Sequence, residues 1–337
     1  MATLKTLSTE LYGEASAQAV QTLLEKSPVF RFFETVGGWE LGGTDFDWRP
    51  AAAAATVAAV AEGGSFNTPT ALSVDSKVTD AQSFYYAGFK ISQSRILDAK
   101  KKLSEMDLWL NKKRQTFHRS FAAGMEKEIF LGAGTSNAMK GFKTILDGST
   151  PLPGYTDTSI YTESMDRLRV LNAQGYAADA TDPSLDLSSS TNHDGFIEML
   201  YDAIALMDDP KGIVIPNYLR PRFTTILRKT NLLTTSQNYE RVVDYFAGIP
   251  LVYVPDAVIA HTEPDDTAGT ALTNTTSIYL LSPEEQRCSL VSNVGMWYYT
   301  YDHVENEYKD TERMGMNLRL KVEDNRSVLR VRNIKVK

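Results

Sequence analysis

Residues 103–131 constrain the fold most, because they carry the apolar pattern of one long amphipathic helix. The apolar positions recur at three-, four- and seven-residue spacing, which places them on one helical face. They are Leu103, Met106, Leu110, Phe117, Phe121, Met125 and Ile129. Ser104 followed by Asp107 resembles a capping box, and glycines at 132 and 134 end the pattern. At a rise of about 1.5 Å per residue the helix spans on the order of 40 Å. Such a helix packed on a sheet is typical of an α+β protein.

The C-terminus has the clearest strand pattern in the chain. From Met314 to Val322, apolar residues alternate with small or polar ones, which is the period of a strand with one buried face. The polar run 323–326 predicts a turn, and Val328 to Val336 predicts a returning strand. We therefore expect a terminal hairpin that closes a sheet against the long helix.

Two segments that precede the long helix lack enough apolar residues for a core of their own. Residues 14–27 predict a short amphipathic helix stopped by Pro28, and three phenylalanines follow it at 30, 32 and 33. Apolar residues so close to a terminus indicate an arm that docks on another surface. Residues 37–95 contain the turn signal Glu62-Gly63-Gly64-Ser65 and two strand-like segments, 70–79 and 83–93. A long hairpin without its own core must lie on another surface, and a neighbouring copy of the chain is the natural candidate.

Residues 135–295 predict a separate α/β region. A helix is expected near 194–208, followed by the buried strand Ile213-Val214-Ile215 and a second helix through Phe223 and Leu227. Two further strands are expected at 242–245 and 249–254, and 262–276 has the composition of an exposed loop. With 337 residues and a hydrophobic content of 42%, the chain is long enough for two cores.

Charge is distributed unevenly along the chain. The net charge is −7, which disfavours a DNA-binding regulator, yet 95–119 holds eight Lys and Arg against three Asp and Glu. A solvated helix face would explain this pattern. A surface that faces packaged DNA or an acidic scaffold would also explain it, with Lys112, Lys113 and Arg114 pointing into a lumen. A third explanation is pairing with acids of an adjacent subunit, around 302–312.

Known catalytic motifs are missing from the sequence. There is no Gly-rich phosphate loop, no Gly-x-Ser-x-Gly elbow, and no metal-ligand spacing among His118, His193, His261 and His303. The single cysteine, Cys288, has no nucleophile signature around it and is expected to be a small buried residue. We expect no enzyme activity, cofactor or metal. The longest apolar run, 51–61, is about half of what a membrane-spanning helix needs, and no signal peptide is expected.

The order of these parts resembles the major capsid proteins of tailed bacteriophages, the Hong Kong 97-like coat-protein family. Three stretches carry the resemblance over essentially the whole chain. They are Phe84-Tyr85-Tyr86-Ala87-Gly88-Phe89-Lys90-Ile91-Ser92 leading to Ile96-Leu97-Asp98, then Gly212-Ile213-Val214-Ile215-Pro216-Asn217-Tyr218 with Phe246-Ala247-Gly248-Ile249-Pro250-Leu251-Val252, and the alternating strands after Val304-Glu305-Asn306-Glu307.

The resemblance implies an N-terminal arm (1–36), an extended loop (37–95) with its inter-subunit tip at Glu62–Ser65, a peripheral domain with a spine helix (96–134 and 296–337) and an axial domain (135–295). It implies pentamers and hexamers of this chain in an icosahedral virion shell assembled in the host cytoplasm. The implied partners are a separate scaffolding protein, a portal and packaged double-stranded DNA, and no membrane. An isopeptide cross-link from Lys77 to Asn317 or Asn325 is a further family feature. The alternatives are an encapsulin-like compartment shell or a cytoplasmic α/β enzyme.

Overall fold

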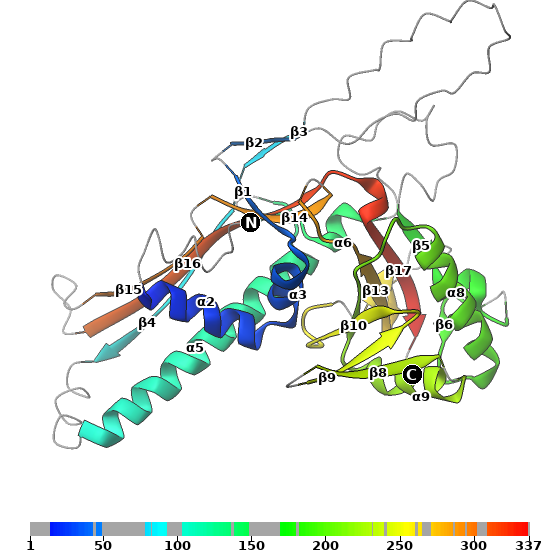
Figure 1. Ribbon diagram of the computed structural model, residues 1–337, viewed down its shortest axis with the longest axis horizontal. Helices are drawn as coiled ribbons and strands as arrows, with labels where there is room; N and C mark the ends of the chain where they lie inside the picture. The colour runs from blue at the N-terminus through cyan, green and yellow to red at the C-terminus, as the bar shows by residue number, and fades with distance from the viewer. Residues whose placement is uncertain are drawn as a thin grey trace, which may run out of the picture.

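The computed structural model places two sheets side by side, with one long helix running along the first of them (Figure 1). It describes residues 14–42, 45–48, 78–81, 83–92, 103–135, 138–147, 169–179, 182–230, 232–238, 241–259, 262–264, 271–285, 287–293, 295–301 and 309–335. The long helix, α5 (Leu103–Leu131), has the predicted bounds. It packs on the first sheet, whereas the second sheet is covered by shorter helices (Figure 1).

The first sheet has five strands and is built around its longest one. The strands are β1 (Trp39–Leu41), β4 (Ser83–Ser92), β14 (Cys288–Ser292), β15 (Met296–Tyr301) and β16 (Lys309–Val322). β16 is paired antiparallel with β4 on one side and with β15 and β14 on the other. Phe117 of α5 meets Phe89 of β4 with ring centroids 5.0 Å apart, and Met125 joins the same core as Met316. From Phe117 to Ile129, the apolar face predicted for the long helix therefore packs in one core with the apolar side chains of β16.

Two N-terminal helices pack on this layer. The predicted helix is α2 (Glu14–Lys26), and a second helix, α3 (Pro28–Val36), begins where the first was predicted to stop. Ser27 caps α3 by accepting a hydrogen bond from the Phe30 amide, 3.1 Å away. The carboxylate of Glu126, from α5, accepts from the Ser27 hydroxyl and from the Val29 amide, 3.1 Å away. A fully buried carboxylate thus joins the N-terminus of α3 to the long helix. Burial raises the pKa of Glu126.

The second sheet has eight strands and forms the α/β region. They are β5 (Val170–Asn172), β6 (Leu185–Asp186), β7 (Gly212–Pro216), β8 (Leu233–Asn238), β9 (Arg241–Phe246), β10 (Ile249–Val254), β13 (Thr275–Leu281) and β17 (Val328–Lys335). Their order is β5-β17-β13-β7-β10-β9-β8, and β6 also pairs with β17. The covering elements are the helices α8 (His193–Ala205) and α9 (Arg220–Lys229) and the 3-10 turns η1 (Ala173–Tyr176) and η2 (Ser190–Asn192).

The helices α8 and α9 meet through apolar side chains over this second sheet. Phe196 and Phe223 lie edge to face with ring centroids 5.4 Å apart. The predicted strand Ile213-Val214-Ile215 is buried along its whole length, and the predicted pair 242–245 and 249–254 forms the antiparallel ribbon β9–β10. The α/β prediction for this region is confirmed.

The terminal hairpin prediction is wrong. β16 and β17 do not pair, because the short 3-10 turn η3 (Asn325–Ser327) passes the chain from the first sheet to the second. β17 lies between β13 on one side and β5 and β6 on the other. Most of its side chains are therefore buried, including that of Arg330, whose guanidinium donates to the Ser277 hydroxyl and the Leu146 carbonyl. A strand with two covered faces suits the centre of a sheet better than an edge hairpin.

Three smaller elements complete the described chain. β2 (Asp45–Trp48) pairs antiparallel with β3 (Val78–Ala81), a ribbon that was not predicted. The strand predicted at 83–93 is β4, whereas most of the strand predicted at 70–79 lies outside the described residues. The region predicted as an exposed loop, 262–276, instead contains the short ribbon of β11 (Thr262–Pro264) and β12 (Ala271–Thr273), and its last two residues begin the buried strand β13. The loop prediction is wrong for these eight residues. The short helix α6 (Phe142–Ile145) closes the end of α5.

Candidate assembly surfaces

The outer face of the first sheet exposes large aromatic side chains. β4 alternates regularly: Tyr85, Ala87 and Phe89 turn toward α5, whereas Phe84 and Tyr86 face away from it. Phe84 is 64% exposed and Tyr86 is 78% exposed. Two adjacent exposed aromatic rings on a rigid strand are unusual for a lone soluble subunit and mark an interaction surface.

An aromatic side chain of a neighbouring strand lies on the same side of the sheet. Gly315 of β16 lies opposite Tyr86 on one side and opposite Trp297 of β15 on the other. A Cβ atom at Gly315 would lie 2.5 Å from Cζ2 of Trp297, so the absence of a side chain there lets the indole lie across β16. Arg313, two residues away, is also exposed. We name Phe84, Tyr86 and Trp297 the aromatic face.

A charged cluster lies under the opposite face, between α5 and the sheet. Glu312 is fully buried, and Arg114 donates to its carboxylate from Nε at 2.9 Å and from Nη2 at 2.6 Å. The Tyr298 hydroxyl donates to the same carboxylate, and its ring meets His118 edge to face at 5.6 Å. Burial lowers the pKa of His118, so this ring is neutral at pH 7. The cluster fixes α5 on the sheet through charge-assisted bonds.

The structure separates the three basic residues that the sequence grouped as lumen-facing. Lys112 and Lys113 are exposed on α5, but Arg114 turns inward to Glu312. Arg114 is therefore paired with Glu312, which belongs to the segment 302–312 considered above as a source of acidic partners. The pair lies within one chain and not across a subunit boundary. The Arg114 side chain is 39% exposed, and its guanidinium is hydrogen-bonded to the Glu312 carboxylate.

Two other groups singled out in the sequence are placed differently. The loop tip Glu62, Gly63, Gly64 and Ser65 lies outside the described residues, as does Lys77. Asn317 and Asn325 are both buried, and Ser292 donates to the Asn317 side chain at 2.8 Å. Burial of both asparagines argues against either one as the acceptor of an isopeptide cross-link from another subunit.

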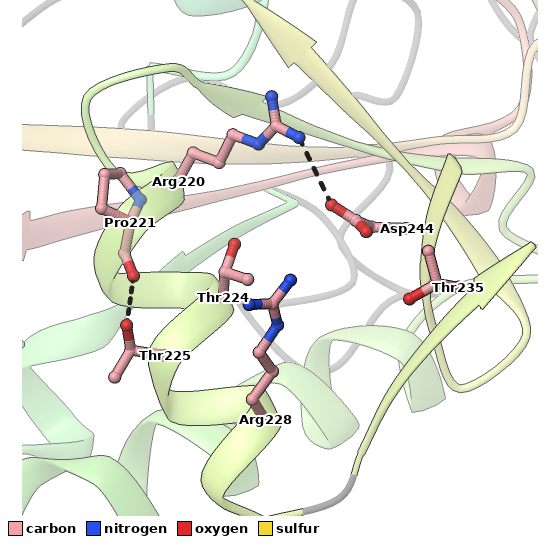
Figure 2. A pocket seen from close by; sticks show the side chains of 7 residues that line it. All are labelled: Arg220, Pro221, Thr224, Thr225, Arg228, Thr235 and Asp244. Carbon is pink, nitrogen blue, oxygen red and sulfur yellow. Dashed lines mark hydrogen bonds and ion pairs between the residues drawn. The ribbon is translucent and has the colours of Figure 1, made fainter. Parts of the chain in front are cut away.

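A polar pocket lies on the second sheet, between α9 and the ribbon of β8 and β9 (Figure 2). Its volume is about 440 Å³, and it is lined by Arg220, Pro221, Thr224, Thr225, Arg228, Thr235 and Asp244. The sequence analysis missed this site. The available signal was the presence of four basic residues and no acidic residue in the ten positions of α9.

The two pocket arginines differ in how they are held. Arg220 Nη2 lies 3.6 Å from Asp244, and its guanidinium stacks 4.1 Å from the centre of the Tyr253 ring. Burial and the nearby Asp244 carboxylate raise the pKa of Tyr253 to about 12, so its hydroxyl stays protonated and donates to Asp244. Among the described residues, none pairs with the side chain of Arg228, which lines the pocket from the same helix, farther along α9 (Figure 2).

The described residues contain no assembled catalytic or metal site. Cys288 is fully buried, and burial raises the pKa of its thiol, which keeps it protonated and unreactive. His118 and His193 are far apart in the sequence and belong to separate layers, and His261 and His303 lie outside the described residues. In the described part of the chain, no three His, Cys, Asp or Glu residues could hold a metal ion together, and no helix is long and apolar enough to cross a membrane.

Comparison with known proteins gives matches at the level of structure. No protein-family model and no curated protein sequence matches the chain. The capsid of cyanophage A-1(L) is 12% identical with a TM-score of 0.60, covering 92% of this chain and 93% of that one. The capsid of an empty GTA particle is 13% identical with a TM-score of 0.55, covering 89% and 88%. The holo-SrpI encapsulin complex of Synechococcus elongatus PCC 7942 is 10% identical with a TM-score of 0.54, covering 88% and 85%.

These likenesses define the chain as a protein with the fold of shell-forming subunits. More particularly, it has the α+β fold of the Hong Kong 97-like capsid proteins over about nine-tenths of its length. The resemblance inferred from the order of the sequence segments is therefore confirmed at the level of the fold.

Proposed function

We propose that the chain is the major capsid protein of a tailed bacteriophage, which assembles into pentamers and hexamers of an icosahedral shell around the genome. The observation that carries the proposal is the fold, which matches capsid subunits such as that of cyanophage A-1(L) over 92% of this chain. The aromatic face supports it, because a shell subunit must bury such a surface against other copies. We expect no enzyme activity, because the solved structures that the chain resembles are shell subunits.

We propose the same division of the chain as the sequence suggested, refined by sheet membership. The arm is 1–36, the extended loop 37–95, the peripheral domain 96–134 with 296–337, and the axial domain 135–295. Sheet membership departs from these bounds for four strands: β1, β4 and β14 belong to the sheet of the spine helix, and β17 belongs to the axial sheet. The proposed partners are a separate scaffolding protein, a portal and non-specific double-stranded DNA, in a virion assembled in the host cytoplasm.

An encapsulin-like compartment shell is the second candidate. The observation that favours it is the encapsulin likeness, whose TM-score of 0.54 is close to those of the phage capsids. The contents of particles made in bacteria distinguish the two. Particles that fill with DNA in the presence of a portal and packaging motor support the capsid proposal, whereas particles that retain a specific enzyme and no genome favour the compartment.

Self-association is the first test of the proposed function. The purified chain, alone and with a co-expressed scaffold, is expected to elute from size-exclusion columns as very large species, and negative-stain microscopy should show rings or shells. A chain that stays monomeric at every salt concentration and with every candidate scaffold contradicts both shell functions. A small oligomer of ordinary size would favour the cytoplasmic enzyme.

Deleting residues 55–70 is expected to leave a folded subunit that no longer forms normal shells. The deleted segment lies between β2 and β3, whose antiparallel pairing keeps both ends of the loop together. The ordered sheets lie outside the deletion, so the melting temperature should change little. Circular dichroism reports whether the subunit is folded, and microscopy reports whether normal shells form. Normal shells from the deleted chain would show that the loop is dispensable.

Reversing the charges of Lys112 and Lys113 together is expected to leave shells intact but to weaken DNA packaging or scaffold recruitment. Both side chains are exposed on α5, and opposite charges there would repel phosphates. Arg114 is left unchanged, because its loss would also break the Glu312 pair. Lys127→Glu, an exposed reversal farther along α5, is the matched control. Retained DNA per shell, measured by absorbance ratio, tests the lumen assignment, which fails if shell formation itself is lost.

A further inference from the structure

The helices α8 and α9 of the second sheet carry opposite and unmixed charge. α8 contains Asp194, Glu198 and Asp202 and no Lys or Arg. α9 contains Arg220, Arg222, Arg228 and Lys229 and no Asp or Glu. All seven of these residues are exposed. One layer of the protein therefore has an acidic helix and a basic helix next to each other.

Each helix presents its charges away from the core. The acids of α8 recur every four residues, which aligns them in one stripe. The buried side of α8 is formed by Phe196, Met199, Leu200 and Ala203, on the opposite side of the helix. On α9, the positions 220, 224 and 228 form the wall of the pocket, and Phe223, Ile226 and Leu227 are buried. The charged stripes therefore face outward, where a partner can reach them.

Most of these charges are not neutralised within the described part of the chain. No described cation pairs with Asp194 or Glu198, and Asp202 accepts a hydrogen bond from the Tyr176 hydroxyl at 2.7 Å. No described acid pairs with Arg222 or Lys229. Both stripes thus keep their charge for an external group.

The two helices lie side by side over one face of their sheet. α8 contacts η1, which follows the edge strand β5, whereas α9 contacts β8, the edge strand at the other end. Figure 1 shows α8 beside β5 and β6, and α9 beside β8. A subunit with adjoining surfaces of unlike charge can join its copies head to tail, and repeated head-to-tail contacts close into a ring when the rotation fits.

We propose that the basic surface of α9, with the pocket at Arg220 and Arg228, binds the acidic stripe of α8 from the next copy within a ring. This inference rests on the proposed shell function and names the electrostatic contact that joins neighbouring axial domains. The pocket admits a carboxylate side chain, because Arg228 lines it without a described partner. Charge complementarity of this kind fixes orientation and speeds encounter.

Two charge-reversal variants and their combination test the contact. Asp194→Lys with Glu198→Lys makes the α8 variant, which changes the charge of α8 from −3 to +1. Arg222→Glu with Arg228→Glu and Lys229→Glu makes the α9 variant, which changes the charge of α9 from +4 to −2. Each variant is expected to raise the protein concentration needed for assembly at least about tenfold, because like charges then meet at every junction. The combined variant carries both sets of changes and is expected to assemble at a lower concentration than either parent, since reversed α8 again meets reversed α9. Lys127→Glu is the control and should assemble normally.

A mixture of the α8 variant and the α9 variant gives a sharper result. Alternating copies have opposite charges at every junction of a six-membered ring, but a five-membered ring must contain at least one like-charged junction. The mixture is therefore expected to yield hexameric assemblies, such as sheets or tubes, and few closed shells. Microscopy and light scattering distinguish these forms.

Each outcome decides the proposal. If the wild-type chain itself does not assemble, the shell function fails before this contact is tested. If the wild type, the α8 variant and the α9 variant assemble alike, or if the combined variant stays as defective as its parents, the contact is overturned. A loss of nucleic-acid binding by the α9 variant with unchanged ring formation also overturns it, and assigns the basic helix to DNA instead. Melting curves for all variants establish that each subunit is folded.

Discussion

Replacing Phe84 and Tyr86 by serine is expected to weaken shell formation strongly while leaving the subunit folded. Both side chains point away from the core and are largely exposed in the single chain, so their removal costs little stability. In a shell, burying two such rings against a neighbour contributes about 2 kcal/mol or more per subunit. Because every subunit repeats the contact, the concentration needed for assembly should rise by more than about tenfold.

The conservative exchange Phe84→Tyr with Tyr86→Phe is the matched control, because it keeps both rings. This control should assemble at nearly the wild-type concentration. Size-exclusion chromatography and microscopy give the assembly readout, and a thermal melt reports the fold. Shells of normal yield from the double serine variant would mean that the aromatic face stays uncovered in the assembly.

Replacing Arg114 by leucine is expected to lower the free energy of unfolding by about 3 kcal/mol. The substitution leaves the buried carboxylate of Glu312 with the Tyr298 hydroxyl as its remaining described partner. The expected loss is at the lower end for a broken buried pair, because Arg114 is 39% exposed and water can enter where its side chain was. Urea denaturation of unassembled subunits measures the loss.

The double variant Arg114→Leu with Glu312→Leu separates the charge from the packing. It removes the stranded carboxylate, so it should recover at least half of the stability lost by Arg114→Leu alone. If the double variant is less stable than either single variant, the pair contributes through attraction that apolar contact cannot replace. The exposed reversal Lys127→Glu should change stability by less than about 0.5 kcal/mol.

The repeating patterns of the sequence predicted the long elements well. The apolar spacing of residues 103–131 predicted the bounds of α5, and alternation from Met314 to Val322 predicted the C-terminal part of β16. In the described part of each element, the apolar side chains at these spacings lie in one core. α3 was missed, although Ser27 before Pro28 is a common helix start. Pro28 was interpreted as a stop for the preceding helix, and it also begins the next one.

Contacts between distant segments could not be predicted from these patterns. Arg114 looks like Lys112 and Lys113 in the sequence, and only the fold brings it to Glu312, 198 positions away. Phe84, Tyr85 and Tyr86 are three aromatic residues in a row, so composition does not say which of them α5 covers. The pairing of β17 likewise depends on distant segments, because its partner is β13 and not the preceding strand β16.

The consecutive strands β16 and β17 lie in different sheets, and this arrangement links the order of synthesis to folding. Of all the described strands, these two leave the ribosome last, yet each lies inside its own sheet with partner strands on both sides. A nascent chain that stops before residue 309 has β14 and β15 without their shared partner, and β13 without β17. Neither sheet can close until translation is almost finished. An incomplete chain therefore cannot hold Phe84 and Tyr86 in a sheet, because among the described strands β4 pairs with β16 alone. Only a chain translated past β16 presents the aromatic face.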